Sequence, residues 1–245
     1  GLQGTLVGLR ASIEGFPTLV AGFMLAAYYL GYMAGSVMTP GLVNSVGHVR
    51  VFAALTSMAS VLILLQGVFV DPVSWTLVRI LFGFCFAGIY VVAESWLNGR
   101  VDNEHRGLLL SIYMLVCYGG LGLGQLLLNV ADPRSTLLFI LVSILISIAM
   151  VPMALTSSSA PAITVPVRVG PRDLFHKSPL GVVGVVVAGA VSGCLFSLGA
   201  IYADGQGFTT FEVSLFMAVA ILAGCVAQLP IGRLSDRMDR RTMVI

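Results

Sequence analysis

Two charged residues lie inside long apolar runs of the sequence, where a charge is energetically unfavourable unless it is hydrated, paired or protonated. Arg79 falls within the run 75–97, near its outer third, and Glu94 lies near the other end. An arginine keeps its proton, so Arg79 can act only electrostatically, by holding an anionic solute or stabilising a carboxylate. Glu94 can form a switchable ion pair or take up a proton. The two are 15 residues apart, which is about 22 Å along a helix, so they cannot pair with each other.

Both charges also have a static interpretation. Arg79 can extend toward the outer lipid headgroups or toward Asp71. Glu94 can pair permanently with Arg50 in the neighbouring inner loop, or with Arg106 after the next turn. The sequence leaves a coupling role and a static role open for all four charged candidates.

The densest cluster of charge follows the apolar run 211–231. Residues 232–241 read Gly-Arg-Leu-Ser-Asp-Arg-Met-Asp-Arg-Arg. Asp236 can accept hydrogen bonds from the first amides of a following helix. Arg237 and Arg240 can pair with carboxylates at nearby helix ends through two parallel hydrogen bonds. The alternative is a basic loop that only sets membrane orientation.

The elements that must position these residues are membrane helices. The chain is 58% hydrophobic and 10% charged, whereas about a quarter of the residues in a soluble domain are charged. About 20 apolar residues cross a bilayer, and the sequence contains several runs of that length. The predicted spans are 16–38, 50–70, 75–97, 108–130, 135–156, 179–202 and 211–231.

The basic residues are unevenly distributed between the loops. If the turn after residue 231 is cytoplasmic and the spans alternate, the outer loops hold only Arg10 and Arg134. This asymmetry is what the positive-inside rule predicts. We therefore expect a multi-pass protein of the cytoplasmic (inner) membrane. The inner loops would hold Arg50, Arg100, Arg106, Arg168, Arg172, Lys177, Arg233, Arg237, Arg240 and Arg241.

One long loop, residues 157–178, divides the chain. Its serines and prolines favour irregular backbone, and we interpret it as a cytoplasmic linker. Residues 1–156 would form an N-terminal helical bundle with a truncated first helix, and residues 179–245 would begin a C-terminal bundle. Because the sequence starts inside one apolar run and ends as another would begin, we expect a fragment of a longer protein without transport activity of its own.

Small and polar residues within the spans indicate packing faces and a cavity. Gly31 with Gly35, Gly83 with Ala87, Gly120 with Gly124 and Gly189 with Gly193 have the spacing that lets helix backbones approach closely. Tyr28, Tyr32 and Gln125 are the candidates for lining a solute cavity. Each of the three can instead form a hydrogen bond between helices. The low polarity favours a hydrophobic or amphipathic solute over a sugar.

Residues 232–241 resemble the loop signature of the major facilitator superfamily, Gly-x-Leu-Ser/Ala-Asp-Arg-x-Gly-Arg-Arg, with Asp239 where the signature has glycine. The resemblance implies that Gly232, Asp236, Arg237 and Arg240 form a conformational latch on the cytoplasmic side. Arg79, followed by Gly83, resembles the fourth-helix arginine motif of many members, which is linked to proton coupling.

Further segments are similar to the YcaD-like subgroup of this superfamily. They are 46–50, 93–98, Arg106-Gly107 and Gly124-Gln125, and the similarity covers most of residues 1–155 and again 232–241. The subgroup implies a fold but no known substrate. Residues 119–124 lack the proline of the superfamily's Gly-Pro antiporter signature, which argues against a drug/proton exchanger.

The resemblance implies an all-α integral membrane fold, a truncated twelve-helix bundle from the end of helix 1 through helix 8. The implied function is secondary active transport of a small solute by alternating access, with coupling to a proton. The alternative is a non-transporting membrane receptor or assembly factor on the same fold. We expect a monomer in the lipid bilayer, with no nucleic-acid partner and no enzymatic activity.

The sequence gives no sign of a cofactor or a metal. No glycine loop ends in Lys-Ser or Lys-Thr, so no ATP site is expected. His48, His105 and His176 are isolated from one another in the sequence, so we expect no metal site.

Overall fold

The computed structural model describes residues 1–99, 105–156 and 170–235. Every regular element in these ranges is helical, as the predicted fold class requires. The elements are α1 (Leu2–Ile13), α2 (Thr18–Val46), α3 (His48–Val68), α4 (Pro72–Asn98), α5 (Arg106–Leu126), the short 3-10 helix η1 (Leu127–Val130), α6 (Leu137–Ala154), α7 (Pro171–Lys177), α8 (Pro179–Gly205) and α9 (Thr210–Ser235).

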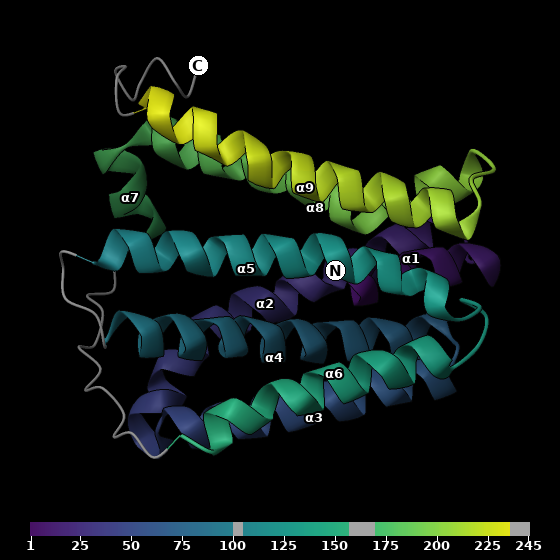
Figure 1. Ribbon diagram of the computed structural model, residues 1–245, viewed down its shortest axis with the longest axis horizontal. Helices are drawn as coiled ribbons and strands as arrows, with labels where there is room; N and C mark the ends of the chain where they lie inside the picture. Colours follow the sequence, from purple (N-terminus) through teal and green to yellow (C-terminus); the bar gives the residue numbers. More distant parts are fainter. Residues whose placement is uncertain (100–104, 157–169, 236–245) are drawn as a thin grey trace.

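Seven helical segments of the described chain are long and apolar enough to cross a membrane. They correspond one to one with the seven predicted spans: α2, α3, α4, α5 continued by η1, α6, α8 and α9. The turns predicted to lie outside gather at one end of the bundle, and the α2–α3 turn lies at the opposite end (Figure 1). The alternating multi-pass topology is therefore confirmed.

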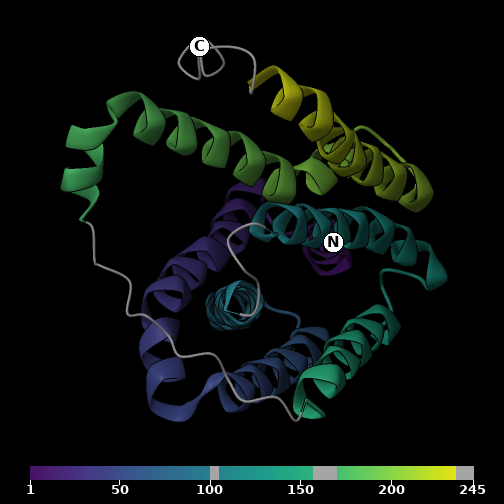
Figure 2. The ribbon, with the colours of Figure 1, turned by 60° about the vertical axis from the view of Figure 1, so that its left-hand side comes forward.

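Helix α4 runs through the middle of a group of helices within residues 1–156. Seen nearly end-on, it is surrounded by α2, α3, α6 and α5 (Figure 2). Helices α8 and α9 lie together beside this group and contact it mainly through α1 and α5, and also through α2 and η1. Gly8 of α1 lies against Ser197 and Ala200 of α8, where an added Cβ would be 3.6 Å from the Ala200 Cβ.

Glycines bring the backbones of α2 and α4 into direct contact. A methyl group at Gly31 would overlap the Ile80 carbonyl, and one at Gly83 would overlap the Tyr28 carbonyl. Gly35 faces the Phe84 carbonyl in the same way. Gly189 of α8, by contrast, has nothing within 4 Å of an added Cβ. The glycine spacing thus marks close packing in α2 and α4, but not at Gly189.

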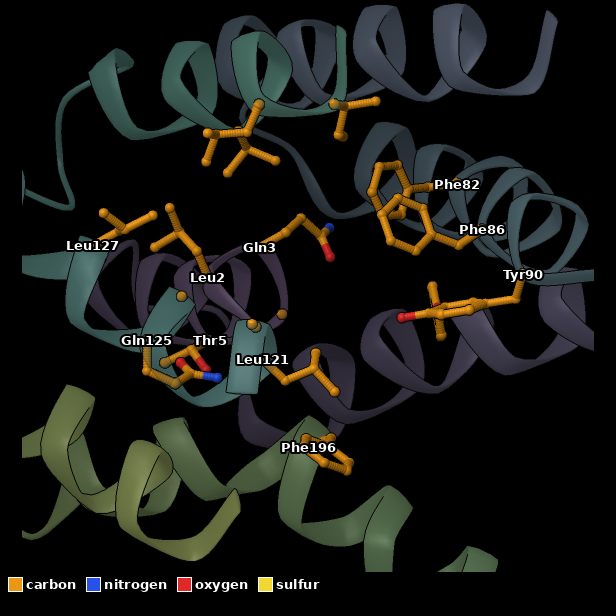
Figure 3. A pocket seen from close by; sticks show the side chains of 18 of the residues that line it. Leu2, Gln3, Thr5, Phe82, Phe86, Tyr90, Leu121, Gln125, Leu127 and Phe196 are labelled. Atoms are coloured by element: carbon orange, nitrogen blue, oxygen red, sulfur yellow. The ribbon is translucent and has the colours of Figure 1, made fainter. Parts of the chain in front are cut away.

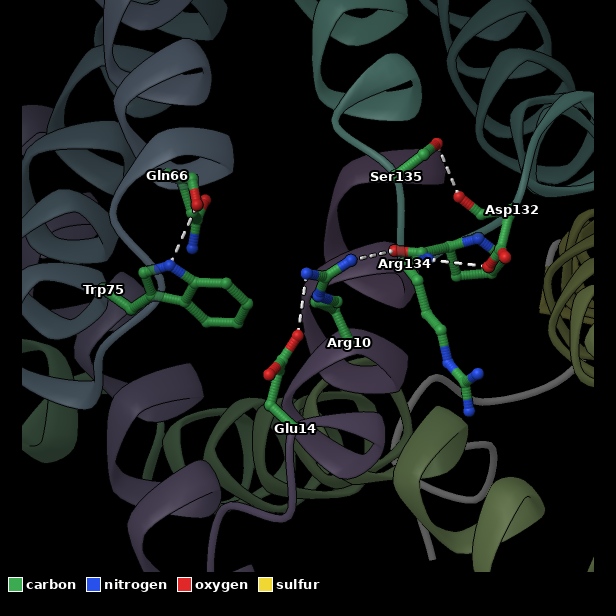
Figure 4. A network of polar contacts seen from close by, with 8 residues as sticks. Arg10, Glu14, Gln66, Trp75, Asp132, Arg134 and Ser135 are labelled. Carbon is green, nitrogen blue, oxygen red and sulfur yellow. Dashed lines mark hydrogen bonds and ion pairs between the residues drawn. The ribbon is translucent and has the colours of Figure 1, made fainter.

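Polar contacts tie together the end of the bundle that carries the outer turns (Figure 4). Arg10 forms an ion pair of 2.7 Å with Glu14 and donates a hydrogen bond of 3.0 Å to the Pro133 carbonyl. The buried Trp75 indole donates to the Gln66 carbonyl at 2.9 Å. These contacts link α1 to the turn before α6, and α3 to α4.

The structure differs from the sequence prediction in two elements. Helix α2 continues through Pro40 to Val46, beyond the predicted end at residue 38, and stops where Gly47 adopts a φ of 96°. The predicted linker 157–178 contains α7, which begins with Pro171 at its first position and ends with His176 and Lys177. Both ends suit a helix, because proline fits the first turn and cations suit the last.

Candidate functional site: a cavity around Arg79

A cavity of about 860 Å³ lies between α1, α2, α4, α5, α6 and α8. Its walls are mainly aromatic and aliphatic, with a few polar groups among them (Figure 3). This size and composition are typical of small-molecule sites. Gly1 and the first residues of α1, Leu2 to Thr5, form part of the wall.

One face of α4 forms the central part of the wall. Arg79, Phe82, Phe86 and Tyr90 follow one another at helical spacing and all line the cavity. The Phe82 and Phe86 rings stack with their centroids 4.5 Å apart. The arginine therefore lies at one end of an aromatic strip on a single helix.

Arg79 is buried at 5% exposure and is held by uncharged groups. Its Nη1 donates to Gln3 Oε1 at 3.0 Å, and its Nη2 donates to the Leu25 carbonyl at 3.4 Å. Its guanidinium carbon lies 4.7 Å from the centroid of the Tyr28 ring. Its Nε has no partner, and no ion pair joins Arg79 to a carboxylate among the described residues.

Asp71, one of the static partners considered for Arg79, has another role. It is the N-cap of α4, where its carboxylate accepts hydrogen bonds from the amides of Val73 at 3.0 Å and Ser74 at 2.9 Å. Hydrogen bonds from Ser74 and then Val73 hold the pKa of Asp71 below its ordinary value of 3.8. Arg79 points instead to α1 and α2.

Gln3 is a contact of Arg79 that the sequence did not indicate. Its Nε2 donates to Gln66 Oε1 at 3.4 Å, which leaves its own Oε1 directed at Arg79. The Gln66 backbone is in turn held by Trp75. A glutamine within the apolar segment 1–10 is the signal that could have found it.

Tyr28, Tyr32 and Gln125 all line the cavity. The Tyr28 and Tyr32 rings lie 5.8 Å apart between centroids. Gln125 is 1% exposed, and its Oε1 has no hydrogen-bond partner in the described part of the chain. The structure thus brings these three residues together with Arg79, and their contact with a solute stays a prediction.

Glu94 lies farther along α4 and is not among the described lining residues. It is half-buried and accepts a hydrogen bond of 3.3 Å from the Tyr113 hydroxyl. Arg50 is exposed and forms no ion pair with Glu94 in the described structure. Arg106 is the first residue of α5, and its side chain is outside the described part. The structure therefore separates Glu94 from both Arg79 and Arg50.

The predicted latch falls at the end of the described chain. Gly232 lies in the last turns of α9. Asp236, Arg237 and Arg240 lie outside the described residues. No group of three or more potential metal-binding side chains occurs in the described ranges.

Comparison with known proteins identifies the family. The model of the Major Facilitator Superfamily matches residues 6–245. The chain belongs to the major facilitator superfamily. It is 31% identical over 244 residues to the uncharacterized MFS-type transporter YcaD of Escherichia fergusonii, and 32% identical over 243 residues to an uncharacterized MFS-type transporter of Yersinia enterocolitica. The predicted superfamily and YcaD-like subgroup are thus confirmed.

These superfamily relatives are longer than the chain. Each alignment covers 96% of the chain and 62% of the relative. A relative from Yersinia pestis shows the same coverage at 30% identity. No solved structure matches the chain. The fold of this superfamily member is therefore that of an integral multi-pass membrane protein of a transporter family.

Proposed function

We propose that the full-length protein is a secondary active transporter that moves a small solute across the cytoplasmic membrane by alternating access, with a proton gradient as the driving force. The observation that carries the proposal is the cavity around buried Arg79, in a chain that belongs to a family of membrane transporters.

The position of the cavity suits alternating access. Most of its wall comes from helices of residues 1–156, and α8 supplies Phe196 and Ser197 from the other group. Rocking of one helical bundle against the other changes the access to a site between them. We assign the latch on the cytoplasmic side to Gly232, Asp236, Arg237 and Arg240, on the basis of their order in the sequence. The protein would act as a monomer.

In this proposal, Arg79 binds the solute and Glu94 couples transport to the proton gradient. Arg79 keeps its proton and acts as a fixed positive charge in the cavity. Glu94 is the proton acceptor, since its carboxylate is half-buried, accepts a hydrogen bond from the Tyr113 hydroxyl and forms no ion pair among the described side chains.

Transport can be measured with the full-length protein in proteoliposomes. A pH gradient imposed across the membrane should drive the uptake of a solute from a broad metabolite panel, and dissipating the gradient should stop the accumulation. Glu94→Gln should abolish gradient-driven accumulation and leave exchange of solute across the membrane. If no solute of the panel is taken up and a protein partner co-purifies, the receptor alternative replaces the proposal.

A further inference from the structure

We infer that the solute is a monoanion, a carboxylate attached to an apolar or aromatic body, and that Arg79 binds the carboxylate. This inference rests on the proposed function, because it names the class of solute for the same cavity. It is carried by the charge and contacts of Arg79 and by the composition of the wall around it.

Arg79 is a buried cation that has no counter-charge among the described residues. It is the only charged side chain among the described residues that line the cavity. Its two hydrogen bonds go to an amide oxygen and a backbone carbonyl, both neutral. The Tyr28 ring offers a cation–π contact, which compensates only part of the lost hydration. An anion in the cavity would supply the missing charge.

The Arg79 guanidinium group also has N–H donors that form no hydrogen bond in the described structure. An arginine carries five N–H donors in a planar fork, and Arg79 uses two of them in the described structure, while its Nε has no partner. A carboxylate matches that fork with two parallel hydrogen bonds. Gln3, itself held by Gln66, fixes one side of the guanidinium group and so acts as a positioning residue.

The rest of the cavity wall is mainly apolar and therefore favours a solute with an apolar body. Phe82, Phe86 and Phe196 project their rings around the cavity, together with Leu121 (Figure 3). A second negative charge on the solute would be buried there without a cation to pair with, which is strongly unfavourable. The free Oε1 of Gln125 adds one acceptor for a hydroxyl or N–H group on the body. These features favour an amphipathic monocarboxylate over a dianion, a cation or a sugar.

Direct binding to the purified full-length protein tests the inference apart from transport. Calorimetric titration would compare phenylacetate and hexanoate with phenylacetamide and phenethylamine, which have a similar shape but no negative charge. We expect the two acids to bind, the amide to bind at least tenfold more weakly, and the amine to show no binding.

Variants connect the binding to Arg79. Arg79→Gln should weaken the binding of phenylacetate at least tenfold, and Arg79→Lys, which keeps the charge but not the fork, should give an intermediate loss. Arg134→Gln removes the same charge from an exposed position outside the cavity and should bind as the wild type does. Size-exclusion profiles would show whether each variant is folded, and the comparison of acid with amide needs no variant.

The outcomes separate the inference from the proposed function. Equal binding of acid and amide, absence of binding by both acids, or unchanged binding in folded Arg79→Gln would overturn the inference. If the acids bind but no pH gradient drives their uptake, the anion site stands and the transport proposal fails. If a neutral or cationic solute is transported while the acids do not bind, the transport proposal stands and the anion site fails.

Discussion

The guanidinium group of Arg79 lies over the face of the Tyr28 ring, 4.7 Å from its centroid. This contact joins α4 to α2 a few residues from the point where Gly83 meets the Tyr28 backbone carbonyl. The buried Arg79 of the cavity wall and one of the close backbone approaches between α2 and α4 therefore share Tyr28. A change at either residue should affect both the packing of α2 on α4 and the electrostatics of the cavity.

Replacing the Tyr28 ring should remove the cation–π contact that helps to hold the Arg79 guanidinium group in place. Tyr28→Leu removes the aromatic face, whereas Tyr28→Phe retains it. A double-mutant cycle with Arg79→Gln, read from thermal unfolding in detergent, should give a coupling free energy of about 0.5–2 kcal/mol for Tyr28→Leu. The same cycle with Tyr28→Phe should give a much smaller coupling. Equal coupling for both variants would mean that the hydroxyl, not the ring, makes the contact.

Enlarging Gly31 should separate α2 from α4. Gly31→Ala puts a methyl group into the Ile80 carbonyl, and such overpacking destabilises by about 1–3 kcal/mol. Gly189→Ala is the matched control, because nothing lies within 4 Å of the added Cβ. That variant should be stabilised by about 0.5–1 kcal/mol, since alanine suits a helix interior better than glycine. Thermal midpoints of the two purified variants check the difference, and equal shifts would contradict the observed contact.

Asp71 should give the protein an acid-dependent loss of stability. Its pKa is held below 3.8 in the folded state, so its stabilising contribution is complete above the unfolded pKa and disappears as the pH falls through the folded pKa. Asp71→Asn keeps an oxygen that can cap α4 but cannot titrate. The wild type should therefore lose stability relative to this variant as the pH falls below 3.8, and parallel melting curves across the acidic range would argue against the effect.

The two ends of the bundle should be accessible from opposite sides of the membrane. In a protein whose four native cysteines are replaced, a cysteine at Asn44 lies in the last turn of α2, and one at Arg134 lies in the turn before α6. A membrane-impermeant thiol reagent added to intact cells should modify the Arg134→Cys variant and spare Asn44→Cys. The reverse labelling would invert the topology and put the basic loops outside.

The acidic residue of the predicted latch should affect the rate of transport more than solute binding. Asp236→Asn removes a negative charge that we expect to hold the cytoplasmic end together, so uptake by the full-length protein should slow several-fold. Asp239→Asn is the matched control, since Asp239 stands where the superfamily signature has glycine. Initial uptake rates and calorimetric affinities measured on the same preparations would separate the two effects. Equal slowing in both variants would assign the effect to lost loop charge alone.

The sequence predicted the membrane spans because their length and apolar character are local properties of the chain. It did not predict that α2 continues through Pro40 to Val46, since proline removes one helical hydrogen bond. Membrane helices tolerate proline where neighbouring groups satisfy the backbone group that it frees. The boundary therefore depended on tertiary context that the pattern does not contain.

The contacts of the site residues were less predictable than their positions. Arg79 was identified because a charge inside an apolar run is conspicuous, but its hydrogen bond to Gln3 crosses 76 positions of the sequence. Glu94 similarly accepts a hydrogen bond from Tyr113, 19 positions away, and forms no ion pair with Arg50 in the described structure. The packing of α1, α4 and α5 decides which polar side chains come into contact. The sequence pattern of a single chain indicates only which residues share a face of one helix.

The contact of Gly8 with Ala200 has a mechanical consequence for α1 and α8. One residue contributes only hydrogen and the other a methyl group, so the surface between these helices is smooth there. Sliding one helix along the other would require little reordering of bulky groups. A large residue at position 8 would act as a wedge between α1 and α8 and would oppose such sliding.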